Sequence, residues 1–149
     1  MIYLLDVNVL LALGYGDHVH HARVARWLRS LPPQGTRLAT CAITELGFVR
    51  VASGPCKLSD GVAAAREGLL RLQAAREFLF LSDALDAECL PSWVQRSKQT
   101  NDGHLVKLAT THAARFATLD TGIPAAELIP DWPAATGVRE EAAAYGMVA

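Results

Sequence analysis

Residues 2–13 of the chain read IYLLDVNVLLAL, and this stretch decides the predicted fold. The apolar run 2–5 predicts a buried strand, and the apolar residues after Asp6 predict a helix over residues 7–13. Asp6 therefore stands where a strand ends and a helix begins. In open α/β folds, ligands bind at this edge of the sheet.

The rest of the chain alternates strand-like and helix-like segments. Strands are expected at residues 37–40, 77–81, 115–119 and, as a short edge strand, 128–130. Helices are expected from Asp17 or His18 to the prolines 32–33, over 42–52, from Ser59 or Asp60 onward, over 91–96, from Thr100 or Asn101 to 114, and over 139–145. This alternation predicts a three-layer α/β/α sandwich with a central parallel sheet, formed by one domain over residues 1–149, with a C-terminal tail at 134–149.

Composition sets further bounds. The chain has 149 residues, enough to bury a sizeable core, and its 14 basic and 15 acidic side chains nearly cancel. Any nucleic acid must therefore be bound by a local basic patch. Cys41, Cys56 and Cys89 are odd in number and lack metal-site spacing, which favours reduced thiols in the cytoplasm. We expect no signal peptide, because Asp6 interrupts the first apolar run, and no membrane span.

Four acids occupy strand-to-helix junctions or helix starts: Asp6, Glu45, Asp102 and Asp120. Taken singly, each has an ordinary structural explanation as a helix cap, a first-turn acid or a turn residue. The carboxyl ends of parallel strands share one edge, however, so these acids are expected to converge there.

Convergence of carboxylates is costly without a cation. Two carboxylates about 4 Å apart repel by about 4 kcal/mol at an effective dielectric constant near 20. Mg²⁺ or Mn²⁺ takes oxygen ligands and relieves this repulsion, and such ions activate water for attack on a phosphodiester. The pattern therefore predicts a metal-dependent enzyme acting on phosphates. Asn8 and Thr118 are the expected supporting residues.

Four motifs carry a family resemblance: LDVNVLLAL at 5–13, ITELGFVR at 43–50, TNDGHLVKLA at 100–109 and FATLD at 116–120. In order and spacing they resemble the four motifs of the PIN domain, as found in VapC-type toxins of bacterial toxin–antitoxin pairs, and the resemblance covers residues 1–129. It implies a Mg²⁺- or Mn²⁺-dependent endoribonuclease in which Asp6, Glu45, Asp102 and Asp120 are the catalytic and metal-binding acids. It also implies a homodimer and a cognate antitoxin.

The chain departs from this pattern at one place. Some members of the family have a further acid just after the fourth motif, where this chain has Thr121-Gly122-Ile123. A second metal ion is therefore expected to be weakly held or absent.

Basic side chains suggest where RNA would lie. Arg23 and Arg26 recur at helical spacing, Arg50 follows the second motif, and Lys98 precedes the third. They form either a solvated basic surface or a set of phosphate contacts that position RNA without reading its sequence. The histidines at 18, 20 and 21 are better explained as a solvated helix start than as metal ligands.

The sequence is also compatible with other functions. They are a PIN-fold nuclease that is not a toxin, a DNA nuclease, a nuclease-dead module that binds RNA or protein, and a receiver-like phosphoryl acceptor. The intact set of four acids argues against a pure binding module, since clustered negative charge repels RNA. A receiver-like site usually pairs acids in the loop after the first strand, where this chain has Asp6 alone.

Overall fold

The computed structural model describes residues 1–133, which fold around a five-stranded sheet. All strand pairings are parallel, and the strand order is β3-β2-β1-β4-β5. The strands are β1 (Ile2–Leu5), β2 (Arg37–Thr40), β3 (Leu79–Phe80), β4 (Ala114–Thr118) and β5 (Glu127–Leu128). The first strand of the chain is thus the central strand, and the predicted parallel sheet is confirmed.

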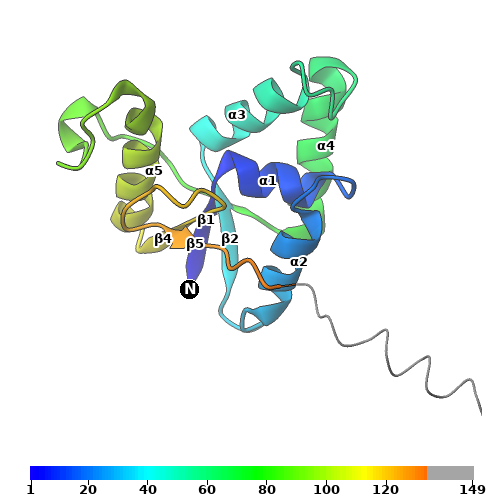
Figure 1. Ribbon diagram of the computed structural model, residues 1–149, viewed down its shortest axis with the longest axis horizontal. Coiled ribbons are helices and arrows are strands. Elements are labelled where there is room, and N and C mark those ends of the chain that lie inside the picture. Colours follow the sequence, from blue (N-terminus) through cyan, green and yellow to red (C-terminus); the bar gives the residue numbers. More distant parts are fainter. Residues whose placement is uncertain (134–149) are drawn as a thin grey trace, which may run out of the picture.

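Helices cover both faces of the sheet (Figure 1). They are α1 (Val7–Gly14), α2 (His21–Ser30), α3 (Ala42–Ala52), α4 (Gly61–Arg76) and α5 (Thr100–Thr111). The first four lie on one face, and α5 lies on the other. The three-layer α/β/α architecture is therefore confirmed.

Alternation along β1 explains the two cores. Tyr3 and Leu5 pack with residues of α1 to α4, whereas Leu4 packs with α5. Leu4 and Leu5 are fully buried, as expected for a strand covered on both faces. Because β1 lies between β2 and β4, Asp6 emerges from the middle of the sheet rather than from an edge strand.

Two helix predictions were wrong. The second helix begins at His21 instead of Asp17 or His18, because the preceding residues form turns in which the N–H groups of His18 and His21 bond to the carbonyls of Tyr15 and His18. Residues 91–96 form no helix. Short 3-10 turns at Ala87–Cys89 and Ser97–Gln99 flank them, and the side chain of Gln99 accepts from the N–H of Arg96.

Several element boundaries also differ from prediction. The strands β3 and β5 have two residues each, β4 is shifted by one residue, and α5 ends at Thr111 rather than 114. The N-cap of α4 is Asp60, but its side chain makes no capping hydrogen bond. The helix predicted over 139–145 lies outside the described residues.

Within residues 1–133, no helix combines the length and the apolar character needed to cross a membrane.

A close approach between α1 and α3 depends on Gly47. A Cβ atom at this position would lie 2.5 Å from Cγ2 of Val7, and Val7 is β-branched, so its side chain has little freedom to turn away within a helix. We expect Gly47→Ala to lower the free energy of unfolding by about 1–3 kcal/mol, measured by urea denaturation. Gly16→Ala is the control, because its Cβ would meet nothing within 4 Å. Equal stability of the two variants would show that α1 and α3 are less tightly packed.

Candidate active site

Asp6 is the centre of the site. It caps α1, accepting a hydrogen bond of 2.7 Å from the backbone N–H of Val7, and it is only 9% exposed. Its second carboxylate oxygen accepts a 2.6 Å hydrogen bond from the hydroxyl of Thr118, the last residue of β4. The side chain of Asp6 is therefore fixed by two elements that are 112 residues apart in the sequence.

Thr118 joins the neighbouring strand ends into one network. Besides donating to Asp6, its buried hydroxyl oxygen accepts from the backbone N–H of Asp120 at 3.0 Å and from the amide of Asn8 at 3.4 Å. The carbonyl oxygen of the Asn8 side chain in turn accepts from the N–H of Leu119 at 3.3 Å. The two predicted supporting residues are thus placed beside Asp6, where they tie the end of β1 to the end of β4.

Asp120 is held by its own turn. Its Oδ1 accepts a 2.8 Å hydrogen bond from the N–H of Gly122. The segment that follows the fourth motif therefore helps to fix the Asp120 carboxylate through the backbone of Gly122.

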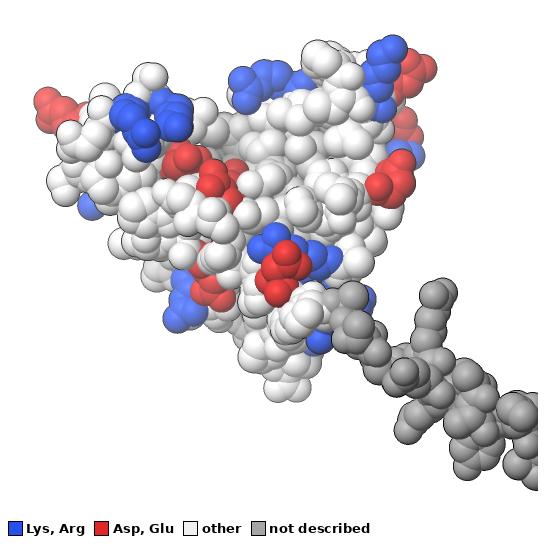
Figure 2. Space-filling view, in the orientation of Figure 1, with Lys and Arg blue, Asp and Glu red and all other residues white. Residues whose placement is uncertain are grey.

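Three of the four acids are near enough to influence one another's pKa. Burial raises the pKa of Asp6, and the charge of Asp120 raises it further, while the hydrogen bonds from Thr118 and Val7 lower it. Burial likewise raises the pKa of Asp102, in the first turn of α5, and the charges of Asp6 and Asp120 add to this effect. Figure 2 shows acidic side chains in the hollow between α5 and the α1–α4 side, with basic side chains on both lips.

Glu45 has different surroundings. It lies in the first turn of α3, and its Oε1 accepts two hydrogen bonds of 2.6 Å, from the hydroxyl of Thr40 and from the side-chain amide of Gln73. Its charge is not among those that shift the pKa of Asp6 or Asp102. In the described part of the chain, no three acidic, histidine or cysteine side chains lie close enough together to share one metal ion. The structure therefore does not bring the four acids into one cluster. Asp6, Asp102 and Asp120 influence one another's pKa, whereas Glu45 has separate hydrogen-bond partners.

Gln73 was not predicted from the sequence as a residue of the site. It lies 28 residues beyond Glu45, near the end of α4, and no motif marks it. Thr40, the last residue of β2, could have been found as a hydroxyl at a strand end, in the same position as Thr118 on β4.

The expected RNA-contacting side chains divide into two groups. Arg23 donates to the backbone carbonyl oxygens of Ile129 and Pro130, and the guanidinium of Arg26 lies 4.7 Å from the ring centroid of Trp132. These two arginines hold the segment after β5 against α2. Arg50 and Lys98 are exposed and remain available to a ligand.

The histidines near α2 have local structural partners. His18 accepts from the N–H of His20 through Nδ1, and Nδ1 of His21 lies 2.7 Å from the carbonyl oxygen of Ala12. His18 and His20 therefore lie in the turns that lead into α2, and only His21 belongs to the helix itself.

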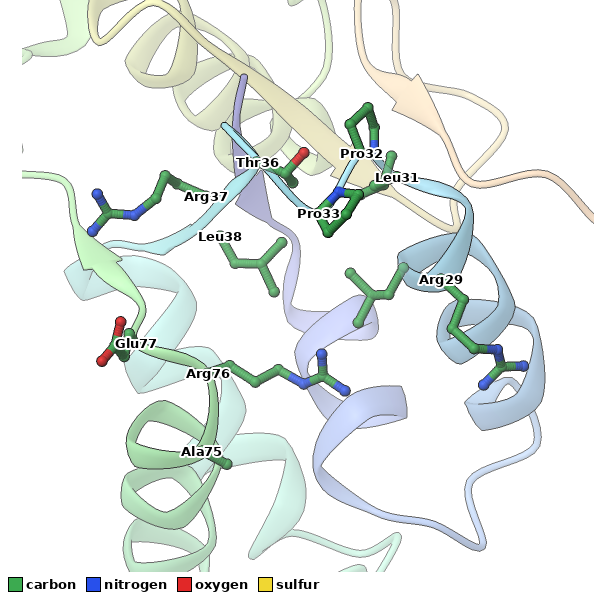
Figure 3. Close-up of a pocket in the computed structure, with 11 residues that line it drawn as sticks. Arg29, Leu31, Pro32, Pro33, Thr36, Arg37, Leu38, Ala75, Arg76 and Glu77 are labelled. Atoms are coloured by element: carbon green, nitrogen blue, oxygen red, sulfur yellow. The ribbon is translucent and has the colours of Figure 1, made fainter.

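The molecule has a cavity of about 450 Å³ at the opposite edge of the sheet, between the ends of α2 and α4 (Figure 3). Leu38, Arg29 and Arg76 are among the residues that line it. None of the four acids lines it. The candidate active site is therefore defined by the acids and not by this cavity.

An apolar groove lies between α3 and α4, beside Glu45. Its volume is about 390 Å³, and its walls include Leu46 and Leu70, which are 71% and 62% exposed. Glu45 and Gln73 both line this groove. Glu45 and Gln73, which are hydrogen-bonded to each other, are therefore both part of this exposed apolar surface.

Comparison with known proteins identifies the class to which this fold and this acidic edge belong. The family model for the PIN domain matches residues 3–128. The chain belongs to the PIN domain family, which confirms the resemblance seen in the four motifs.

Its relatives within the family are VapC ribonucleases. The chain is 42% identical over 125 residues to Ribonuclease VapC44 of Mycobacterium tuberculosis, which covers 80% of this chain and 87% of the relative. It is 40% identical over 124 residues to Ribonuclease VapC38 of the same organism, covering 80% and 86%. Among solved structures, the crystal structure of VapBC2 from Rickettsia felis bound to a DNA fragment from their promoter matches with a TM-score of 0.56 and 16% identity, over 89% of this chain and all of that chain. The last match concerns the fold alone.

The raised pKa of Asp102 predicts a pH-dependent stability. A carboxyl group whose pKa is higher in the folded than in the unfolded state stabilises the fold most below about pH 4, and this contribution is lost as the pH rises through the folded-state pKa. In EDTA at pH 7.5, we therefore expect Asp102→Asn to melt at a higher temperature than the parent protein. At pH 4 the difference should shrink.

The control is Asp60→Asn, the same substitution at a helix N-cap whose side chain makes no capping hydrogen bond. It should leave the melting temperature nearly unchanged at both pH values. A melting temperature of Asp102→Asn below that of the parent protein at pH 7.5 would contradict mutual repulsion among the three acids.

Proposed function

We propose that this protein is a metal-dependent endoribonuclease and the toxin of a toxin–antitoxin pair, with residues 1–149 forming one PIN domain. The observation that supports this most directly is the convergence of Asp6, Asp102 and Asp120, two of which have raised pKa values. A site that holds like charges together is poised to bind a cation. The names of its relatives supply the substrate class, since they are ribonucleases.

The donor set fits a hard divalent cation. Mg²⁺ is usually bound through one or two carboxylates and keeps several waters. Asp6 and Asp102 would hold such an ion, with Asp120 and Glu45 acting through water or toward a second ion. Mn²⁺ has the same ligand preference. When bound, the ion supplies Lewis-acid stabilisation of the phosphate and a more acidic water for hydrolysis.

Other residues of the chain would position the acids and the RNA. Thr118 holds one oxygen of the Asp6 carboxylate by donating a hydrogen bond from its hydroxyl, and this hydrogen bond favours the ionised form of Asp6. Asn8 fixes the turn that carries Asp120 by accepting from the N–H of Leu119. Arg50 and Lys98 are the proposed contacts for RNA phosphates. Arg23 and Arg26, which were expected to share this role, are assigned instead to holding residues 129–132.

Two protein partners are proposed. A cognate antitoxin would cover the acidic edge and compete with RNA for it. A second copy of the chain would cover the exposed apolar side chains of α3 and α4, among them Leu46, Val62 and Leu70, to form a symmetric dimer.

Catalysis is tested by replacing the acids. Asp6→Asn keeps the cap of α1, since Asn is also a good N-cap, but it removes a ligand charge. We expect RNA cleavage in Mg²⁺ to fall by at least about 100-fold in Asp6→Asn and Asp102→Asn, as judged by mapping RNA ends. Smaller losses are expected for Glu45→Gln and Asp120→Asn. Circular dichroism should show that each variant remains folded.

The same Asp60→Asn variant serves as control for activity, because Asp60 lies at the start of α4 and outside the group of converging acids. Full cleavage of RNA by Asp6→Asn would show that the proposed metal site takes no part in the reaction. If the parent protein cuts single-stranded DNA but not RNA, the chain is a DNA nuclease on the same fold.

Assembly is tested on the exposed apolar side chains of α3 and α4. We expect the parent protein to be a dimer at micromolar concentration by light scattering, and Leu46→Asp with Leu70→Asp to shift it to a monomer, because charges in an apolar interface lose their hydration. Val19→Asp is the matched control, since Val19 is 84% exposed but lies between α1 and α2. A monomeric parent protein would contradict the proposed dimer.

A further inference from the structure

The two oxygens of the Glu45 carboxylate are not equivalent. Oε1 accepts both the hydroxyl of Thr40 and the amide of Gln73, each at 2.6 Å, and Oε2 accepts from neither. Two donors on one oxygen fix the plane of the carboxylate. The orientation of Glu45 at the acidic edge is thus set by its neighbours as well as by its own helix.

The two donors come from different parts of the fold. Thr40 ends β2 and lies five residues before Glu45, so it belongs to the same strand–helix unit. Gln73 belongs to α4, 28 residues later. Only the hydrogen bond from Gln73 therefore links the orientation of Glu45 to the position of another helix.

The end of α4 holds Gln73 in place. The backbone carbonyl of Gln73 accepts from the N–H of Glu77 at 2.9 Å, and Glu77 adopts a left-handed conformation that turns the chain toward β3. Gln73 is only half-buried, because it lines the groove between α3 and α4 together with Leu46 and Leu70. A side chain that packs into this groove would therefore contact Gln73, the residue that donates to Glu45.

We propose that Gln73 is a positioning residue of the active site, which orients the Glu45 carboxylate toward a divalent cation and couples this orientation to the groove between α3 and α4. The inference rests on the proposed metal-dependent function and adds a residue that no motif marks. Residues that hold a ligand in place typically change metal affinity or activity by about 10- to 100-fold when they are replaced. Gln73 belongs to this class because it contacts Glu45 and not the other three acids.

The experiment is a double-mutant cycle on the full chain, read out by Mn²⁺ binding in the absence of RNA. Four proteins are titrated: the parent, Gln73→Leu, Glu45→Gln and the double variant. We expect Gln73→Leu to weaken Mn²⁺ binding by about tenfold, the lower end of the range because Thr40 still bonds to Glu45. In the Glu45→Gln background, Gln73→Leu should have no further effect, since it acts only through the carboxylate.

The matched control is Gln34→Leu, the same substitution at an exposed position in the turn before β2, away from the groove and the four acids. It should bind Mn²⁺ as the parent does. If Gln73→Leu fails to fold by circular dichroism, Gln73→Asn replaces it in the cycle, because the shorter side chain keeps the amide but not its reach.

The outcomes separate the two proposals. If the parent binds Mn²⁺ and Gln73→Leu binds equally well, or if the two substitutions weaken binding additively, the positioning role is wrong while the metal site stands. If none of the proteins binds Mn²⁺, the proposed metal site is wrong and the positioning role is wrong with it. Weakening by Gln73→Leu that disappears in the Glu45→Gln background supports the role.

Discussion

The hydrogen bond from Thr118 to Asp6 is the interaction on which the site depends. It joins the end of β4 to the end of β1 and holds a carboxylate that is only 9% exposed. The same hydroxyl accepts from the N–H of Asp120 and so places a second acid beside the first. A single buried threonine thus holds the acids that follow two neighbouring strands. The packing of α5 against β4 brings Asp102 near enough for the charges of Asp6 and Asp120 to raise its pKa.

This arrangement opposes the stability of the domain. The sheet and its two cores stabilise the fold, while burial makes ionisation of Asp6 and Asp102 less favourable and so raises the pKa of both side chains. Functional sites are where a folded chain departs from the rules that stabilise the rest of it. Here the departure is confined to the carboxyl ends of two strands and the start of one helix, all of them fixed by hydrogen bonds or close packing.

The sequence predicts what is periodic or local. Apolar runs that end in Asp6 and near Asp120 predicted β1 and β4, and their parallel pairing placed both acids on one edge. The segment before α5 was mispredicted because its shape is set by contact rather than by pattern: a Cβ on Gly103 would lie 2.2 Å from Cγ2 of Val94, so this segment is packed tightly against the start of the helix. Gln73 was missed for the same reason, since a hydrogen bond across 28 residues leaves no trace in spacing.

The strand order has a consequence for synthesis. Ribosomes deliver the chain from its N-terminus, and β1, β2 and β3 with the helices between them can pair as soon as about residue 80 has emerged. The other neighbour of β1 is β4, which begins at Ala114. Until that strand arrives, Asp6 lacks both Thr118 and Asp120. The nascent chain therefore carries an incomplete acidic site until Thr118 and Asp120 have emerged and β4 has paired with β1.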